Sequence, residues 1–338
     1  MSIGLEGKQV KVPVADEHRI EFRDEEFRFM HHRHWSLYNS MYYSTYVAAR
    51  LKVWSNEGRN RLEELMAKMG FSLDQCRQKF PFMSAQLRSR LKDQINKYAH
   101  EYHLADVTYK GFTRCAGFKS PVAAADIVHS VSALMEHVEK HQPPVSPEQE
   151  DDPKAAAEAD AEAWLSAFND AYESLGIGIR GAKFFKEGLT LSMELQKAVV
   201  NQAVEMMQKS SIGRLNKFRY AYIQSGDCQE VLFQQPMALR RLAYFLIEVH
   251  HENGKWTGSK ALPLVLLAER ASTYLVVGVD CNEQAQDVMK NRFGVHFKLA
   301  AQECQTHVRH DGFDASAVEV AKEDVPQFIE SLMIILNA

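Results

Sequence analysis

The sequence contains few cysteines, no long apolar run and no large excess of charge of one sign. Its cysteines are scattered, odd in number, and include no C-x-x-C pair: Cys76, Cys115, Cys228, Cys281 and Cys304. This pattern excludes a zinc ribbon and predicts reduced thiols in a cytosolic or nuclear compartment. No stretch approaches the roughly 20 apolar residues of a membrane helix, and the N-terminus has no apolar run of signal-peptide length. We therefore expect a soluble, intracellular protein with no membrane partner.

The formal net charge of −4 gives the molecule no global basic field. Contact with nucleic acid would therefore depend on a local basic patch. The apolar fraction of 46% and the charged fraction of 25% are ordinary for a globular protein. A chain of 338 residues is long enough for two domains, or for one domain with a large insertion.

The motifs of several enzyme classes are missing as well. The sequence has no G-x-S-x-G nucleophile elbow, no P-loop and no G-x-G-x-x-G dinucleotide motif. It also has no cluster of acids with interleaved histidines, which a two-metal phosphodiesterase needs. We therefore predict no catalytic residue, no metal site and no cofactor.

The hydrophobic pattern predicts an α+β or α/β protein, in which an all-helical, insertion-type region precedes a C-terminal α/β domain. Residues 1–23 form a polar lead-in segment with two short strand-like pieces, and residues 24–139 form the helical region. Residues 140–160 are rich in Pro, Ala and acids, and we expect a flexible linker or a surface loop there. Residues 161–338 contain helices that lead into the α/β domain.

Individual elements follow from periodicity and from Gly and Pro positions. Gly70 is expected to end a helix, residues 109–117 to form a loop rich in Gly and aromatic residues, and Pro121 to start an apolar helix. Strands are expected at residues 218–223, 231–233, 264–267, 274–279 and 317–320. Later helices are expected at residues 238–250, 293–308 and 325–336.

Two groups of histidines stand out. On a helix, His31 and His34 would share one side, but no carboxylate or Cys lies at ligand spacing from them. The favoured interpretation is a helix end or junction packed by Trp35, with the histidines satisfied locally, and metal binding is the alternative. His250 and His251 fall at a helix end, where cationic histidines suit the helix dipole.

Basic residues gather around a predicted helix-to-strand junction. Lys209, Arg214, Lys217 and Arg219 alternate with aromatic residues. Positive charge next to aromatic faces is typical of single-stranded nucleic-acid binding, through phosphate attraction and base stacking. The alternative is a solvated face whose aromatic residues turn into the core.

Several ordered segments resemble the cell division control protein 45 family. The segments are 27–41 (FRFMHHRHWSLYNSM), 48–55 (AARLKVWS), Gly58, 69–70, 117–119, 125–128, 134–136, 293–294, 300–303, 313–314 and 328–332. The resemblance extends from about residue 20 to the end of the chain. Several segments in family order over that length are more specific than any single motif.

The resemblance implies a subunit of the eukaryotic replicative helicase, which combines a family member with the minichromosome maintenance hexamer and GINS. It also implies a nuclear location and contact with polymerase epsilon and loading factors. The family derives from RecJ-type phosphoesterases of the DHH/DHHA1 class and is regarded as catalytically inactive. By this comparison the chain lacks the DHH domain, begins near the helical insertion and ends in a DHHA1-like domain. The alternatives are a surviving phosphodiesterase or exonuclease, and a pure interaction module.

RecJ-type relatives carry a glycine-rich motif that contacts nucleic acid, and its counterpart here resembles residues 292–301 (RFGVHFKLAA). One glycine and the histidine remain, while Phe293 and Val295 replace the glycines that would let the backbone approach a phosphate. The candidate contacts with DNA or a partner are therefore the following: Lys217, Arg219, Arg292, His296 and Lys298.

Overall fold

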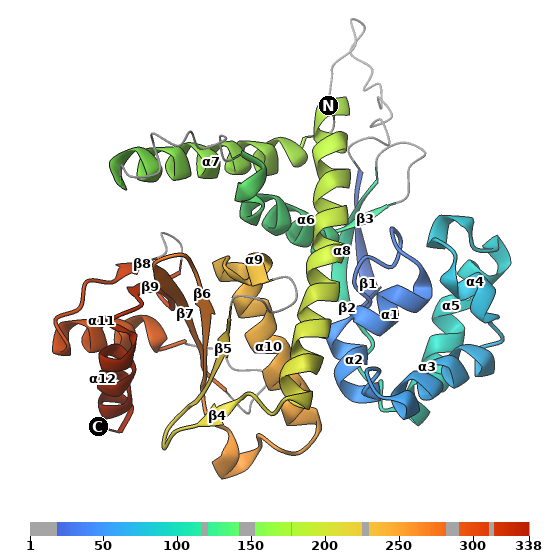
Figure 1. Cartoon of the computed structure of the whole chain (residues 1–338). Helices are drawn as coiled ribbons and strands as arrows, with labels where there is room; N and C mark the ends of the chain where they lie inside the picture. Colours follow the sequence, from blue (N-terminus) through green and yellow to red (C-terminus); the bar gives the residue numbers. More distant parts are fainter. Residues whose placement is uncertain are drawn as a thin grey trace, which may run out of the picture. The chain divides into compact units, whose positions relative to one another are not determined.

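The computed structural model describes residues 19–115, 121–141, 153–176, 178–224, 230–281, 291–310 and 314–337. The chain divides into two compact units, which we describe separately. Unit 1 comprises Met1–Ser44 and Arg61–Met193, and unit 2 comprises Thr45–Asn60 and Glu194–Ala338. Both units combine helices with a sheet (Figure 1), so the predicted mixed α and β class is confirmed.

Unit 1 contains a three-stranded antiparallel sheet in the order β1-β2-β3. Its strands are β1 (Arg19–Phe27), β2 (Thr108–Cys115) and β3 (Val122–Ala123). The prediction of an all-helical region was therefore wrong, as was the predicted loop over residues 109–115, while residues 116–117 lie outside the described residues. Gly111 interrupts the pattern of β2 and reads as a loop signal, but pairing with β1 over most of its length outweighs the weak local propensity.

Unit 1 also contains α-helices. They are α1 (Leu37–Tyr43), the latter part of α3 (Asn56–Lys68), α4 (Leu73–Arg77), α5 (Ala85–Tyr98), α6 (Ala124–Glu136), α7 (Pro153–Ser174) and the first part of α8 (Ile179–Gln208). Gly70 has φ +77°, and the amide of Phe71 bonds to the carbonyl of Met66, so the predicted helix end is confirmed. The expected linker overlaps α7 from Pro153 onward, and residues 142–152 lie outside the described residues.

Unit 2 contains a six-stranded mixed sheet in the order β4-β5-β6-β7-β9-β8. Its strands are β4 (Gly213–Arg214), β5 (Arg219–Ile223), β6 (Leu264–Glu269), β7 (Thr273–Val279), β8 (Arg309–His310) and β9 (Ala317–Ala321). Only β5 and β6 run parallel; the other neighbours are antiparallel. The predicted strands at 218–223, 264–267, 274–279 and 317–320 are confirmed. The predicted strand at 231–233 was wrong, because so short an apolar run cannot be told from one helical turn.

Helices cover both faces of this second sheet (Figure 1). The covering helices are α10 (Pro236–Glu252), α11 (Phe293–Glu303) and α12 (Val325–Asn337), and the unit also contains α2 (Thr45–Leu51), α9 (Glu230–Phe233) and the end of α8. Side chains of α11 and α12 form one core with β5, β6, β7 and β9, while α10 packs on β6 and β7 and contacts α2. Within the described residues, no helix is both long and apolar enough to cross a bilayer.

Candidate functional site

The predicted basic cluster lies at the turn between β4 and β5. Arg214 and Lys217 are exposed there, whereas Phe218 is fully buried in the core. Tyr220 and Tyr222 also pack against this core. The aromatic side chains therefore contribute mainly to the core, and the turn offers exposed positive charge without a fully exposed stacking face.

Arg219 is not an exposed charge. Its relative exposure is 7%, and its guanidinium carbon lies 4.5 Å from the centre of the Trp256 ring. Nη1 of Arg219 lies 3.5 Å from the carbonyl oxygen of Leu262. Burial, with a smaller effect of the Arg214 charge, lowers the pKa of Arg219. The expectation that Arg219 faces solvent was wrong, because the cation–π contact draws the side chain into the interior.

The same Trp256 ring stacks on His250, with 4.1 Å between ring centroids. Both ring nitrogens of His250 are buried without a hydrogen-bond partner among the described residues. Burial, followed by the charges of Lys255 and Arg219, lowers the pKa of His250 to about 4. His250 is therefore neutral at pH 7, and the expectation of a cationic histidine at this helix end was wrong for this residue.

The remaining predicted contacts lie on α11 or, for Arg292, directly before it. Arg292 and Lys298 are exposed, and His296 is partly buried against Phe293. Arg292 and His296 are four positions apart and share one side of the helix, whereas Lys298 follows His296 by two positions and points to another side. Asp280 occupies the start of the helix, where its carboxylate accepts a hydrogen bond of 3.0 Å from the Arg292 amide. A fixed anion at this position opposes the binding of a phosphate.

The glycine that remains from the family motif has a packing role. A Cβ atom on Gly294 would lie 2.6 Å from the Cβ atom of Ala315, which is closer than real side chains approach. Phe293 is fully buried in the core of unit 2. Gly294 therefore allows α11 to approach the segment before β9.

Unit 1 contains a buried polar network that the sequence pattern did not reveal. Nδ1 of His31 lies 3.0 Å from Oδ1 of Asp126 on α6, and Nε2 lies 2.9 Å from the hydroxyl oxygen of Ser192 on α8. All three side chains are buried. A carboxylate can only accept, so Nδ1–H of His31 donates to Asp126. Nε2 forms the second hydrogen bond of the ring, with the Ser192 hydroxyl. The expectation of locally satisfied histidines was wrong for His31.

The charge of Asp126 is stabilised inside this network. Burial alone would raise the pKa of Asp126, but contacts with His31 and His34 outweigh it, and the pKa lies well below its ordinary value. Nε2 of His34 lies 3.5 Å from Oδ2 of Asp126, an ion-pair distance that is too poorly directed for a hydrogen bond. The amide of Ala123 donates to the same oxygen at 3.3 Å. The folded protein therefore holds Asp126 as a carboxylate.

His31 itself lies in a turn between β1 and α1. Its φ of +54° is in the left-handed region, which is unfavourable for a residue with a Cβ atom. The amides of His34 and Trp35 both donate to its carbonyl at 2.9 Å. The structure thus confirms a junction here, followed by α1 with Ser36 as its N-cap.

His32, the next residue, has a different environment. Burial, with a smaller effect of the Arg33 charge, lowers the pKa of His32 to about 3, so this histidine is neutral. Arg33 forms a bidentate pair with Glu26, which is 3% exposed. The pairing register of β1 with β2 shifts between Arg23 and Glu26, and this irregularity precedes the buried acid.

The order Ser192–His31–Asp126 is that of a nucleophilic triad, but the burial of all three side chains separates the hydroxyl from substrate. The arrangement ties the turn to α6 and α8. Across the residues that the structure describes, no group of three or more His, Cys, Asp or Glu side chains is arranged to hold a metal ion.

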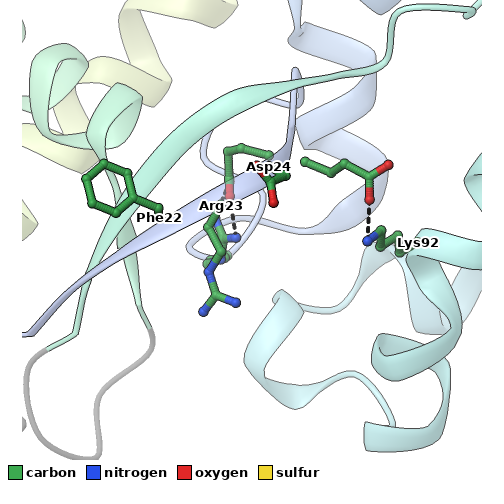
Figure 2. A pocket seen from close by; sticks show the side chains of 7 residues that line it. Phe22, Arg23, Asp24 and Lys92 are labelled. Atoms are coloured by element: carbon green, nitrogen blue, oxygen red, sulfur yellow. Dashed lines mark hydrogen bonds and ion pairs between the residues drawn. The ribbon is translucent and has the colours of Figure 1, made fainter.

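A pocket of about 440 Å³ lies beside β1. It is lined by Phe22, Arg23, Asp24, Glu25, Glu26, Arg33 and Lys92 (Figure 2). Lys92 pairs with Glu25, and Arg33 pairs with Glu26. Because these charges neutralise one another, the pocket shows no preference for an anionic or a cationic ligand.

Comparison with known proteins identifies the family. The CDC45 family pattern matches residues 5–334, nearly the whole chain. The chain belongs to the CDC45 family. It is 36% identical over 341 residues to the cell division control protein 45 homolog of Schizosaccharomyces pombe, with 95% of this chain and 52% of that protein covered. The homolog of Dictyostelium discoideum is 33% identical over 309 residues, with 91% and 45% covered.

A solved relative shares the fold. The crystal structure of CDC45 from Entamoeba histolytica superimposes with a TM-score of 0.65 at 21% identity, covering 98% of this chain and 59% of that one. The chain spans about half the length of the curated relatives that it matches. The resemblance inferred from the sequence segments is thus confirmed.

Sequence reasoning missed Asp126 and Ser192 as partners of His31. The available signal was the placement of an acid and a hydroxyl on apolar helix faces, since buried polar groups need partners. It could not indicate which partners, because they come from distant parts of the chain. The binding surface formed by the five predicted contact residues remains a prediction, and one of the five, Arg219, is buried.

Proposed function

We propose that this chain acts in eukaryotic DNA replication as a non-catalytic component of the replicative helicase assembly, together with the minichromosome maintenance hexamer and GINS. The observation that carries the proposal is the family match over residues 5–334, with relatives named cell division control protein 45. Contact with polymerase epsilon and loading factors, and a nuclear location, belong to the same proposal. Since about half of each relative is matched, the role of the whole relative is assigned here only as a proposal.

The arrangement of acids supports the non-catalytic part of the proposal. Phosphodiester cleavage by two metal ions needs clustered carboxylates that hold the ions about 3.5–4 Å apart. Two buried acids of unit 1 are instead held by internal contacts: Glu26 pairs with Arg33, and Asp126 accepts a hydrogen bond from His31. Incubation of the purified chain with labelled single-stranded DNA and manganese should leave the DNA intact. Degradation that disappears when these acids are changed would favour the phosphodiesterase alternative.

Weak binding of single-stranded DNA is an additional part of the proposal. Arg214 and Lys217 are exposed cations of the predicted cluster, whereas the exposed Lys209 pairs with Glu205. Such charges would act on phosphates without reading sequence. The carboxylate of Asp280 beside Arg292 and the burial of Arg219 favour the second candidate, a pure protein-interaction module.

Binding to purified assembly components tests the main proposal. The chain is immobilised, and the hexamer and GINS are passed over it separately and then together. We expect saturable binding to at least one component, and a higher affinity when both are present. Absence of binding to both, with a chain shown to be folded by circular dichroism, would reject the proposal.

A further inference from the structure

Helix α7 buries one side composed of small residues. Ala163, Ala167, Ala171 and Ser174 follow a spacing of three or four residues and are all buried. This side packs on α6 and on the 3₁₀ turn Val138–His141, where Val138 joins Ala163 and Ala167 in a small apolar cluster. The small side chains let the helices approach closely.

His141 fixes α7 further. Its Nδ1 lies 2.9 Å from the hydroxyl oxygen of Ser166, and its Nε2 lies 3.3 Å from Oδ2 of Asp170. Both partners lie on α7, one turn apart. The helix is therefore held along its small-residue side and its orientation within unit 1 is defined.

A neighbouring side of α7 exposes large apolar side chains, which we call the α7 stripe. Its members are Trp164, Leu165, Phe168 and Tyr172, together with Leu175, which directly follows the last residue of the helix. Their exposed fractions range from 36% for Trp164 to 68% for Tyr172. At about 100° per residue, these positions fall within roughly 100° of the helix circumference. An amphipathic helix normally buries such a stripe, so α7 carries an apolar face beyond the one that packs on its own unit.

Exposed apolar side chains also lie on the sheet of unit 1, which contacts the end of α7. Nη1 of Arg114 on β2 donates to the carbonyl of Leu175 at 2.8 Å. Arg114 pairs with Ile20, and Phe112 pairs with Phe22, so these four side chains share one face of the sheet. Ile20 is 59% exposed and Phe22 is 88% exposed. Exposed large apolar side chains on adjoining elements of one unit are typical of an interaction site.

The charges of α7 define the chemistry of the partner. Its acidic residues are Glu158, Asp160, Glu162, Asp170 and Glu173, and its one basic residue is Lys154. Glu162 and Glu173 are exposed beside the stripe. Two copies of α7 in contact would therefore bring like charges together, which disfavours a second copy as the occupant. Acidic flanks also disfavour a membrane surface, because cytoplasmic leaflets are anionic.

We propose that the α7 stripe docks into an apolar groove, rimmed by Lys and Arg, on a protein subunit of the helicase assembly. The proposal rests on the proposed function and adds the surface and the chemistry of its partner. Anchors at spacings of three and four residues are the pattern by which an amphipathic helix fills a groove. Basic residues on the rim would pair with Glu162 and Glu173 and set the direction of the helix.

Matched variants of the full chain test this surface. The stripe variant is Leu165→Ser with Phe168→Ser and Tyr172→Ser, and the control is Val295→Ser with Leu299→Ser, two exposed apolar residues of α11. Affinities for the purified hexamer and for GINS are measured by biolayer interferometry. We expect the stripe variant to lose at least about tenfold in affinity for one of them, since central apolar anchors dominate such interfaces. The control should bind as the unchanged chain does.

A second pair of variants tests the charge of the rim. Glu173→Lys should weaken the same interaction at low salt, while Glu303→Lys on α11 should not. Equal binding by the stripe variant and the unchanged chain would overturn the inference alone. Failure of the unchanged chain to bind either component would reject the proposed function as well. Sedimentation that shows stripe-dependent self-association, or stripe-dependent adsorption to phosphatidylserine vesicles, with component binding unaltered, would also overturn it.

Discussion

His31 and Ser192 lie 161 positions apart in the chain, and Nε2 of His31 is 2.9 Å from the Ser192 hydroxyl oxygen. With Asp126 on the other ring nitrogen, the imidazole connects the turn before α1 to α6 and α8. Both ring nitrogens of His31 are hydrogen-bonded, and the side chains of His31, Asp126 and Ser192 are shielded from water. The stability of unit 1 should therefore depend on three residues that no local pattern would group together.

Asp126→Asn should destabilise unit 1 by about 1–3 kcal/mol, because the amide replaces a charge-assisted acceptor. The pKa of Asp126 is lowered in the folded state, so its contribution is present above the unfolded pKa near 3.9 and is lost as the pH falls through the folded value. Urea unfolding between pH 6 and about 2 should show a flatter acid limb for the variant. Asp93→Asn, at an exposed position of α5, is the control and should leave the midpoint unchanged.

His250→Phe should be tolerated and should reduce the acid sensitivity of unit 2. Phenylalanine keeps the stack on Trp256 and removes two buried nitrogens that have no partner among the described residues. With a folded pKa of about 4, the neutral imidazole contributes stability that is present above pH 6.5 and is lost as the pH falls toward 4. The free energy of unfolding falls by at most about 1.4 kcal/mol per pH unit over this range. Unfolding midpoints at several pH values should diverge between the two chains only below pH 6.5. His251→Phe, at an exposed neighbouring position, should not alter this slope.

Gly188→Ala should destabilise unit 1, although alanine favours a helix over glycine by about 1 kcal/mol. The new Cβ atom would lie 2.3 Å from the Ser130 hydroxyl oxygen and 2.6 Å from its carbonyl oxygen, so α8 and α6 would have to separate. Overpacking of this kind costs about 1–3 kcal/mol. Gly178→Ala meets no atom within 4 Å and serves as the control in thermal unfolding. A stabilised Gly188→Ala variant would mean that α6 and α8 move apart without cost.

Arg219→Ala should lower the thermal midpoint of the chain, whereas Lys217→Ala should not. Arg219 loses its contact with Trp256 and leaves a gap in the interior, while Lys217 is exposed, and exposed charges contribute little. A loss of about 1–2 kcal/mol is expected for Arg219, in line with a desolvated cation–π contact. Scanning calorimetry compares the two variants. Equal midpoints for both would indicate that the Trp256 contact is not maintained in solution.

Arg214→Ala with Lys217→Ala should weaken the binding of single-stranded oligonucleotides at low salt without changing the fold. In a plot of the logarithm of the binding constant against the logarithm of the salt concentration, each phosphate contact that is lost should reduce the slope by about 0.7. Fluorescence anisotropy over a range of salt concentrations measures this slope. Arg88→Ala with Arg90→Ala, at exposed positions of α5 in unit 1, provides a control of equal charge change. Identical affinities for all three proteins would remove the β4–β5 turn from any DNA surface and favour the interaction module.

The sequence predicted best where local pattern and tertiary environment agree. The buried run at 274–279 could only be a strand, and Gly70 supplies the left-handed conformation that ends α3. It failed for β2, where pairing with a distant strand outweighs the presence of Gly111. It also failed for Arg219, since charge alone does not indicate whether a guanidinium faces water or a Trp ring. The residues of the polar network could not be paired at all, because they come together only through the tertiary fold.

The contact between His31 and Ser192 also sets an order of events during biosynthesis. The turn that holds His31 is synthesised first, and its hydroxyl partner is added 161 residues later. At about 5–20 residues per second, this interval lasts roughly 8–32 s. Throughout it, the His31 imidazole lacks one of its hydrogen-bond partners, so this network closes only after Ser192 has been synthesised. Slowing the ribosome before the codon for Ser192 should therefore prolong the exposure of the incomplete network and raise the yield of aggregated protein.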